Sequence, residues 1–103
     1  MNDMMMDGYP KDELELRDLR ERISLIDEQM AELFEQRMQI SEYILRIKRR
    51  LGLPIYDPAR EEEILSKGEL RMDEELRPYY TDFLQKCMEL SRAYQESLLK
   101  EET

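Results

Sequence analysis

The stretch from Leu16 to Leu51, LRDLRERISLIDEQMAELFEQRMQISEYILRIKRRL, decides the fold of this chain. Apolar residues recur along it at alternating steps of three and four, the heptad spacing of a helix that packs along one stripe. One of the eleven members of the series, Arg37, is charged, and a buried guanidinium needs an anionic partner. The other ten members are apolar and are called the seam: Leu16, Leu19, Ile23, Ile26, Met30, Leu33, Ile40, Ile44, Ile47 and Leu51.

This spacing predicts one helix from about Glu13 to Leu51, ended by Gly52. A helix of that length extends over about 55–60 Å, whereas a compact domain of 100 residues has a radius of gyration of about 13 Å. Because the chain cannot cover the whole seam by itself, we expect a second copy to cover it in a homodimer. A longer coiled-coil assembly is the alternative.

Two further helices are predicted, which makes the chain all-α with one very long, one short and one long helix. Asp57-Pro58 favours the start of a short helix over residues 58–66, which Lys67-Gly68 would end. A third helix is expected from an N-cap at Asp73 to about Lys100. Residues 1–12 show no sustained period, so we expect a flexible N-terminal tail followed by one helical domain over residues 13–103.

The composition excludes several classes of function. The chain has 103 residues, a net charge of −9, one cysteine and no histidine. Without histidine, Ser/His and Cys/His catalysis and most zinc sites are ruled out, so we expect no metal. An acidic surface argues against nucleic-acid or anionic-membrane partners. No apolar run approaches the roughly 18 residues of a membrane span, and none looks like a signal peptide, so we expect a cytoplasmic protein.

Three cations on the long helix are candidates for ligand binding. Arg37 and Lys48 lie eleven residues apart and leave the helix on one face, where they could converge on a small ligand. Arg20 lies about 100° round the helix and could serve the pocket of a partner chain instead. For Arg20 and Lys48 the alternative is a surface charge beside the seam. For Arg37 it is an ion pair with a glutamate of the third helix.

Further candidates lie on the two shorter helices. Asp57, Arg60 and Glu61 cluster at the start of the second, where capping is the alternative role of Asp57. Ser91 and Gln95 share one face of the third, where the alternative is a hydrogen-bonded polar pair in the core. Together these groups suit a small dianion that bears a hydroxyl. Without a nucleophile or histidine, catalysis would consist of fixing a reactive conformer and stabilising developing charge, as in a unimolecular rearrangement.

The segments Leu19–Asp27, Pro54–Glu61 and Ser91–Gln95, with Arg37 and Lys48, resemble the all-helical (AroQ-type) chorismate mutases. The likeness covers about residues 13–100. It implies an intertwined homodimer with two shared active sites. It also implies an isomerase of the shikimate pathway that converts chorismate to prephenate in aromatic amino acid biosynthesis, by a [3,3] Claisen rearrangement without a cofactor.

The resemblance also implies a role for each candidate. Arg37 and Arg20 of the partner subunit would bind the two carboxylates of chorismate, and Arg60 would help to shape the cationic pocket. Lys48 and Gln95 would donate to the ether oxygen, where negative charge builds as the C–O bond breaks. The remaining contacts would be made to the ring hydroxyl by Asp57 and Glu61, and to a carboxylate by Ser91.

Two departures and two rival functions remain. Tyr56 stands where some members carry an arginine, so that cation is expected to be absent, and the segment over residues 65–75 looks shorter. No fused dehydratase, dehydrogenase or sensing domain is expected. An isochorismate pyruvate-lyase of the same fold would be less polar at the positions of Glu61 and Ser91. A non-enzymatic helical dimerisation module would explain the seam but not the buried polar residues.

Overall fold

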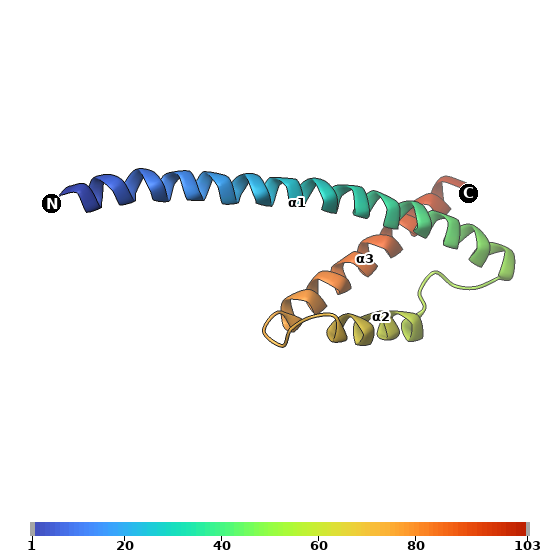
Figure 1. Ribbon diagram of the computed structural model, residues 1–103. Helices are drawn as coiled ribbons and strands as arrows, with labels where there is room; N and C mark the ends of the chain where they lie inside the picture. The colour runs from blue at the N-terminus through green and yellow to red at the C-terminus, as the bar shows by residue number, and fades with distance from the viewer. Residues whose placement is uncertain (1, 103) are drawn as a thin grey trace. The chain divides into compact units, whose positions relative to one another are not determined.

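The computed structural model describes the backbone of residues 2–102 and the side chains of residues 11–101. Within these residues the chain forms three helices and no strand (Figure 1): α1, Asn2–Leu51; α2, Pro58–Leu70; and α3, Arg77–Glu102. The predicted all-α chain of three helices is confirmed. The chain divides into two compact units, Met1–Gln36 and Arg37–Thr103.

The helix α1 begins at Asn2, earlier than the predicted start at about Glu13. The helix includes Gly8 and Pro10, the two residue types with the lowest helix propensity, so propensity does not explain this early start. We predicted that residues 1–12 are flexible. The side chains of residues 1–10 lie outside the described part of the chain. The division into a tail and a domain over residues 13–103 therefore stays a prediction.

The C-terminal end of α1 is closed by a Schellman motif at Gly52. The φ angle of Gly52 is 70°, a left-handed conformation that glycine adopts without steric cost. The N–H of Gly52 donates to the carbonyl of Arg49 over 3.3 Å, and the N–H of Leu53 donates to the carbonyl of Lys48 over 2.8 Å. The predicted end of the helix is confirmed.

The helix α2 starts as predicted but extends further. The Oδ1 atom of Asp57 accepts a hydrogen bond of 3.1 Å from the N–H of Arg60, which confirms that Asp57 caps the helix. The predicted end at Lys67-Gly68 is wrong, because α2 continues to Leu70.

Gly68 makes a helix–helix contact instead of ending the helix. It is buried, and a Cβ atom at this position would lie 2.3 Å from Cδ1 of Leu84 and 3.3 Å from Cε2 of Tyr80, both on α3. A lysine followed by glycine is typical of a helix C-terminus, which explains the wrong prediction. Here the glycine leaves room for the side chains of Leu84 and Tyr80, which fill the space that a Cβ atom would take.

The helix α3 begins at Arg77, and the predicted N-cap at Asp73 is wrong. The carbonyl of Asp73 accepts hydrogen bonds from the N–H groups of Leu76, over 3.0 Å, and Arg77, over 3.1 Å, so a turn precedes the helix. Pro78 explains the late start. In a helix that began near Asp73, Pro78 would lie beyond the first turn, where proline removes a hydrogen bond and clashes with the preceding turn.

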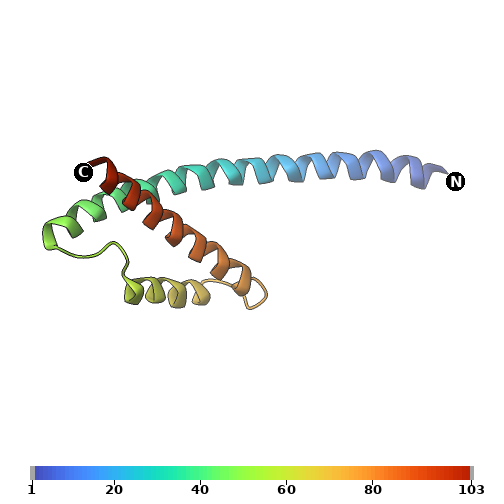
Figure 2. The ribbon, with the colours of Figure 1, turned by 180° about the vertical axis from the view of Figure 1, so that it is seen from behind.

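In the unit Arg37–Thr103, α3 runs back from the turn after α2 to the last turns of α1 (Figures 1 and 2). Leu45, Leu84 and Met88 are the buried apolar side chains among the described residues. The seam does not contribute to this core, because its ten members are between 43% and 66% exposed. The neighbouring face of α1, with Ser41 and Leu45, is the buried one. The chain by itself therefore leaves the seam uncovered.

Two features are absent from the part of the chain that the structure describes. None of its helices combines the length and the apolar character that a membrane span requires. Three or more cysteine, aspartate and glutamate side chains do not gather anywhere in a group that could hold a metal ion.

Candidate active site

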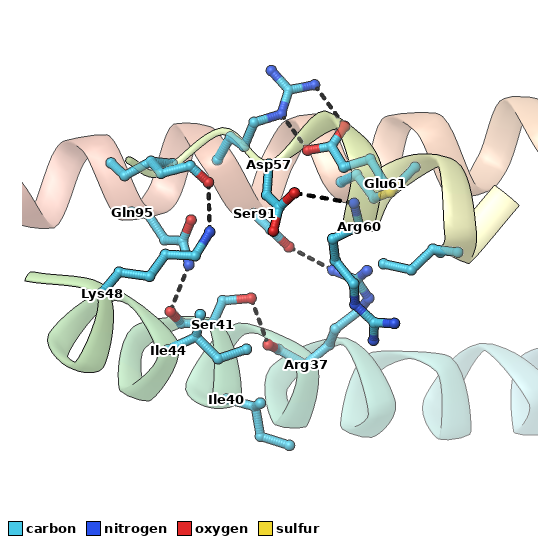
Figure 3. A pocket seen from close by; sticks show the side chains of 14 residues that line it. Arg37, Ile40, Ser41, Ile44, Lys48, Asp57, Arg60, Glu61, Ser91 and Gln95 are labelled. Carbon is cyan, nitrogen blue, oxygen red and sulfur yellow. Dashed lines mark hydrogen bonds and ion pairs between the residues drawn. The ribbon is translucent and has the colours of Figure 1, made fainter. Parts of the chain in front are cut away.

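A pocket of about 370 Å³ lies within the unit Arg37–Thr103, between the last turns of α1, the segment after it, α2 and α3 (Figure 3). Its volume is in the range of small-molecule sites, about 300–1,000 Å³. Five apolar side chains form part of its wall: Ile40, Ile44, Ile55, Ile64 and Met88. Seven of the eight candidate residues from the sequence line it: Arg37, Lys48, Asp57, Arg60, Glu61, Ser91 and Gln95.

Arg37 joins α1 to α3 at one end of the pocket. Its Nη1 atom donates a hydrogen bond of 2.6 Å to Oγ of Ser91, which is 8% exposed. Among residues 11–101, Arg37 forms no ion pair with a glutamate of α3, so the structural ion pair considered above is not formed within that range. A guanidinium has five N–H donors, and the bond to Ser91 uses one of them.

Gln95 joins the same two helices deeper in the pocket. It is 5% exposed, and its Nε2 atom donates a hydrogen bond of 2.7 Å to the backbone carbonyl of Ser41. The hydroxyl of Ser41 turns back to the carbonyl of Arg37 over 2.9 Å. Ser91 and Gln95 therefore each form a hydrogen bond to α1, Ser91 with Arg37 and Gln95 with Ser41. They do not form the hydrogen-bonded pair with each other that was the alternative.

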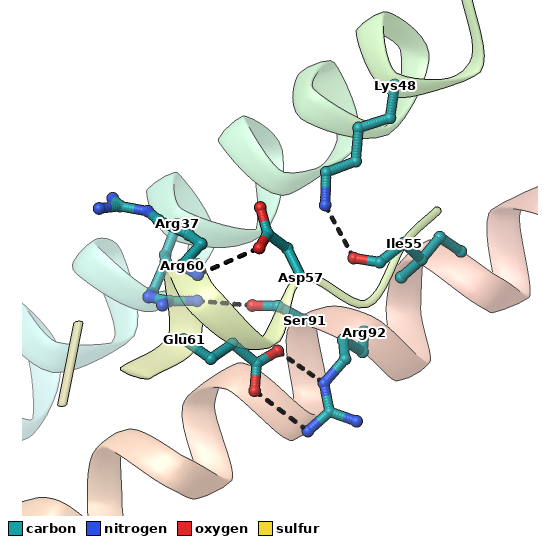
Figure 4. A network of polar contacts seen from close by, with 8 residues as sticks. All are labelled: Arg37, Lys48, Ile55, Asp57, Arg60, Glu61, Ser91 and Arg92. Atoms are coloured by element: carbon teal, nitrogen blue, oxygen red, sulfur yellow. Dashed lines mark hydrogen bonds and ion pairs between the residues drawn. The ribbon is translucent and has the colours of Figure 1, made fainter. Parts of the chain in front are cut away.

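Lys48 is held at the other end of the pocket by the segment that follows α1. Its Nζ atom donates a hydrogen bond of 2.7 Å to the backbone carbonyl of Ile55 (Figure 4). The side chain is partly buried and lines the pocket, so it is not simply a surface charge beside the seam. An ammonium has three N–H donors, so this bond leaves two for other acceptors.

Asp57 and Arg60 line the pocket from the first turn of α2. The cap bond of Asp57 uses Oδ1. The guanidinium of Arg60 pairs with Oε1 of Glu63 over 2.5 Å. The hydrogen bond and charge of Lys67, and then those of Arg60, lower the pKa of Glu63 below its usual value of 4.5. The charge of Arg60 is therefore shared with a carboxylate of its own helix.

Glu61 is tied to α3 by Arg92, a residue that the sequence did not single out. The Nε atom of Arg92 donates to Oε2 of Glu61 over 2.8 Å, and its Nη2 atom donates to Oε1 over 3.4 Å (Figure 4). The guanidinium carbon lies 4.9 Å from the centroid of the Tyr56 ring, a cation–π distance. Position 56 itself carries no cation, but the guanidinium of Arg92 lies beside its ring.

Sequence reasoning missed Arg92 for a physical reason and Ser41 for an avoidable one. Arg92 lies one position beside the apolar stripe of α3, and its partner Glu61 is 31 residues away, so no local pattern links them. Ser41 follows Arg37 by four residues on the same face of a helix, and that spacing could have identified it.

Arg20 is the one candidate that does not line this pocket. It lies on α1 in the unit Met1–Gln36, and it is exposed in the isolated chain. That Arg20 contributes to the pocket of a partner chain stays a prediction.

The charges of the pocket differ in sign from those of the whole chain. Four cations line it, Arg37, Lys48, Arg60 and Arg92, against two carboxylates, Asp57 and Glu61, which gives 4 − 2 = +2, whereas the chain carries −9. The excess of positive charge favours a small anion. The neutral donors Ser91 and Gln95 can bind polar atoms of that anion, and the aliphatic wall can exclude water from it.

Comparisons with known proteins agree on one family. The chorismate mutase type II family matches residues 19–96. A bifunctional chorismate mutase/prephenate dehydratase of Aquifex aeolicus (strain VF5) is 32% identical over 76% of this chain and 24% of the relative. The T-protein of Haemophilus influenzae is 34% identical over 56% of this chain and 15% of the relative. A chorismate mutase of Methanocaldococcus jannaschii is 35% identical over 50% of this chain and 52% of the relative.

No solved structure gives a significant match to the chain. The matches with the three relatives cover between 15% and 52% of the length of those proteins. The family match, in contrast, covers most of this chain and includes all eight candidate residues from Arg20 to Gln95. The chain belongs to the chorismate mutase type II family.

Proposed function

We propose that this chain catalyses the conversion of chorismate to prephenate in the biosynthesis of aromatic amino acids. The observation that carries the proposal is the convergence of Arg37, Lys48 and Gln95, from α1 and α3, on one pocket with an excess of positive charge. Chorismate is a dianion with a ring hydroxyl and an ether oxygen. The pocket offers cations, carboxylates and neutral donors that match these three features.

The chemistry needs positioning and charge stabilisation only. In the [3,3] rearrangement the C–O bond of the ether breaks while a C–C bond forms, without a covalent intermediate. Lys48 retains two N–H donors beyond its bond to Ile55, and Gln95 retains one beyond its bond to Ser41. These donors would stabilise the negative charge on the ether oxygen, which is the kind of interaction that contributes most to rate enhancement.

The other residues would hold the substrate in its reactive conformer. Arg37 would bind one carboxylate with the donors that Ser91 leaves unused, and Arg60 adds positive charge at the start of α2. Asp57 and Glu61 would accept from the ring hydroxyl, and Ser91 would support a carboxylate. Because the rearrangement is unimolecular, fixing the reactive conformer lowers only the conformational part of the barrier.

We further propose an intertwined homodimer in which Arg20 of the partner subunit completes each site. The exposure of the seam, between 43% and 66% at all ten positions, supports an association that buries it. Full burial of a leucine or isoleucine contributes about 1.5–3 kcal/mol, and burying the exposed part of each seam residue would add a fraction of that value, which favours dimerisation. The cytoplasmic location and the lack of a cofactor, of a nucleic-acid partner and of a membrane partner stay predictions from the sequence.

The test is to mix the purified chain with chorismate, follow the loss of its ultraviolet absorbance and identify the product. We expect prephenate at a rate at least about 10⁶-fold above the uncatalysed reaction. Pyruvate in place of prephenate would select the lyase. A folded dimer without turnover would refute the enzymatic proposal and leave the dimerisation module.

A further inference from the structure

We propose that Arg92 is a positioning residue, which neutralises Glu61 and fixes its carboxylate so that the pocket admits a dianionic substrate. The proposal rests on the proposed function, because its readout is turnover of chorismate. The observation behind it is the bidentate ion pair between Arg92 on α3 and Glu61 on α2, which the sequence did not predict.

The setting of Glu61 makes a neutralising partner necessary. Its side chain is 19% exposed and lines a pocket proposed to bind two carboxylates. An unpaired carboxylate there would repel a dianion, and the repulsion is stronger than in water because the surroundings are partly dry. Arg92, with a side chain 35% exposed, is the cation that Glu61 contacts.

The geometry also restricts the motion of both side chains. Two roughly parallel N–H···O contacts fix the guanidinium and carboxylate planes relative to each other. The guanidinium also lies over the ring of Tyr56, with its carbon 4.9 Å from the ring centroid. The longer of the two contacts, 3.4 Å to Oε1, leaves that oxygen the better placed to accept a hydrogen bond from a substrate hydroxyl.

The experiment is a double-mutant cycle of Arg92→Gln and Glu61→Gln, with KM and kcat for chorismate as the readouts. In Arg92→Gln the charge of Glu61 is unpaired, so we expect KM to rise about tenfold, with a smaller change in kcat. In the double variant that charge is removed, so KM should fall back below that of Arg92→Gln. A purely structural role would give no rescue by a second substitution in the pocket.

Two further variants keep the test decisive. Arg92→Lys retains the charge but loses the bidentate hydrogen bonding to Glu61 and the stacking of a planar guanidinium on Tyr56. Its KM should therefore lie between those of the wild type and Arg92→Gln. Lys86→Gln removes the same charge from an exposed ion pair with Glu89 on the same helix, outside the pocket, and should leave KM unchanged. If Arg92→Gln does not fold, a KM of Arg92→Lys equal to that of the wild type overturns the proposal.

The outcomes separate this inference from the proposed function. An inactive wild-type chain would refute both. An active wild type whose KM is unchanged in Arg92→Gln, or whose two substitutions act independently, would refute the role of Arg92 alone. A raised KM that Glu61→Gln partly restores supports the proposal.

Discussion

Arg37 on α1 donates a hydrogen bond of 2.6 Å to the hydroxyl of Ser91 on α3, although the two residues are 54 positions apart. The guanidinium that interrupts the heptad series therefore meets a neutral acceptor inside its own chain. A neutral hydroxyl does not balance the charge, and the pocket beside it has an excess of cations. The relationship is the one expected of an arginine that is oriented by the protein and neutralised by a ligand.

Arg37→Ala should reduce kcat/KM by at least about 100-fold, because it removes the cation that would bind a substrate carboxylate. Far-UV circular dichroism and the mass in solution should remain those of the wild type. Ser91→Ala, which removes only a neutral acceptor, should cost less, about tenfold. Loss of the folded dimer in Arg37→Ala would instead assign the arginine a structural role.

Lys48→Ala should lower kcat by about 100-fold or more, near 3 kcal/mol, because the ammonium would stabilise charge that develops only in the transition state. Steady-state kinetics with chorismate measure the effect. Lys86→Ala, on an exposed part of α3, provides a control that should behave as wild type. Equal kinetics of the two variants would exclude Lys48 from the chemistry.

Arg20→Ala and Lys48→Ala chains, each inactive alone, should regain activity when they are mixed and allowed to exchange subunits. If Arg20 acts across the interface, each hybrid dimer has one intact site, and random exchange restores about a quarter of the wild-type activity. Mass spectrometry under native conditions would verify that hybrids form. Hybrids without activity would show that Arg20 serves its own chain or none.

Gly68→Ala should destabilise the fold by about 1–3 kcal/mol, because its Cβ atom would lie 2.3 Å from Cδ1 of the buried Leu84. Thermal unfolding should show a Tm about 4–8 °C lower per kcal/mol. Ser66→Ala, at an exposed position of the same helix, is the control, and it should be neutral or slightly stabilising. An increase in Tm for Gly68→Ala would mean that Leu84 and Tyr80 can move away from the Cβ atom at a cost smaller than the gain in helix propensity.

The pKa of Glu63 should lie below 4.5 in the folded chain and should rise in Lys67→Ala, because Lys67 is the main cause of the shift. A lowered pKa in the folded state means that the pairing stabilises the fold at neutral pH. That contribution is lost as the pH falls through the folded-state pKa, below 4.5. An NMR titration of the glutamate side chains checks both statements, with Lys86→Ala as the variant that should leave Glu63 unchanged.

The sequence was sufficient to identify most of the polar residues of the pocket, because polar residues at apolar positions are conspicuous in a helical pattern. Arg37, Ser91 and Gln95 were found in this way, and Asp57 followed from the rule that aspartate before proline caps a helix. Gly68 was misread because helix-ending glycines and glycines at helix crossings look alike until the neighbour, Leu84, is known.

The contacts that escaped prediction are those that depend on how the chain folds between two elements. The bond from Lys48 to the carbonyl of Ile55 depends on the path of a six-residue connection, and the ion pair of Arg92 with Glu61 depends on how α2 and α3 meet. Neither follows from a period or a motif. Pro78, in contrast, could have located the start of α3 from the sequence, because proline is strongly disfavoured beyond the first turn of a helix.

The closing turn of α1 has a consequence for how this pocket can change. The carbonyl of Lys48 accepts from Leu53, and its ammonium donates to Ile55, so one residue anchors the connection at two points. Inserting or deleting a single residue between Gly52 and Asp57 would break one anchor or pull the ammonium out of place. The length of this short loop is therefore as much a part of the site as its charged side chains, and natural or engineered variation should accumulate elsewhere.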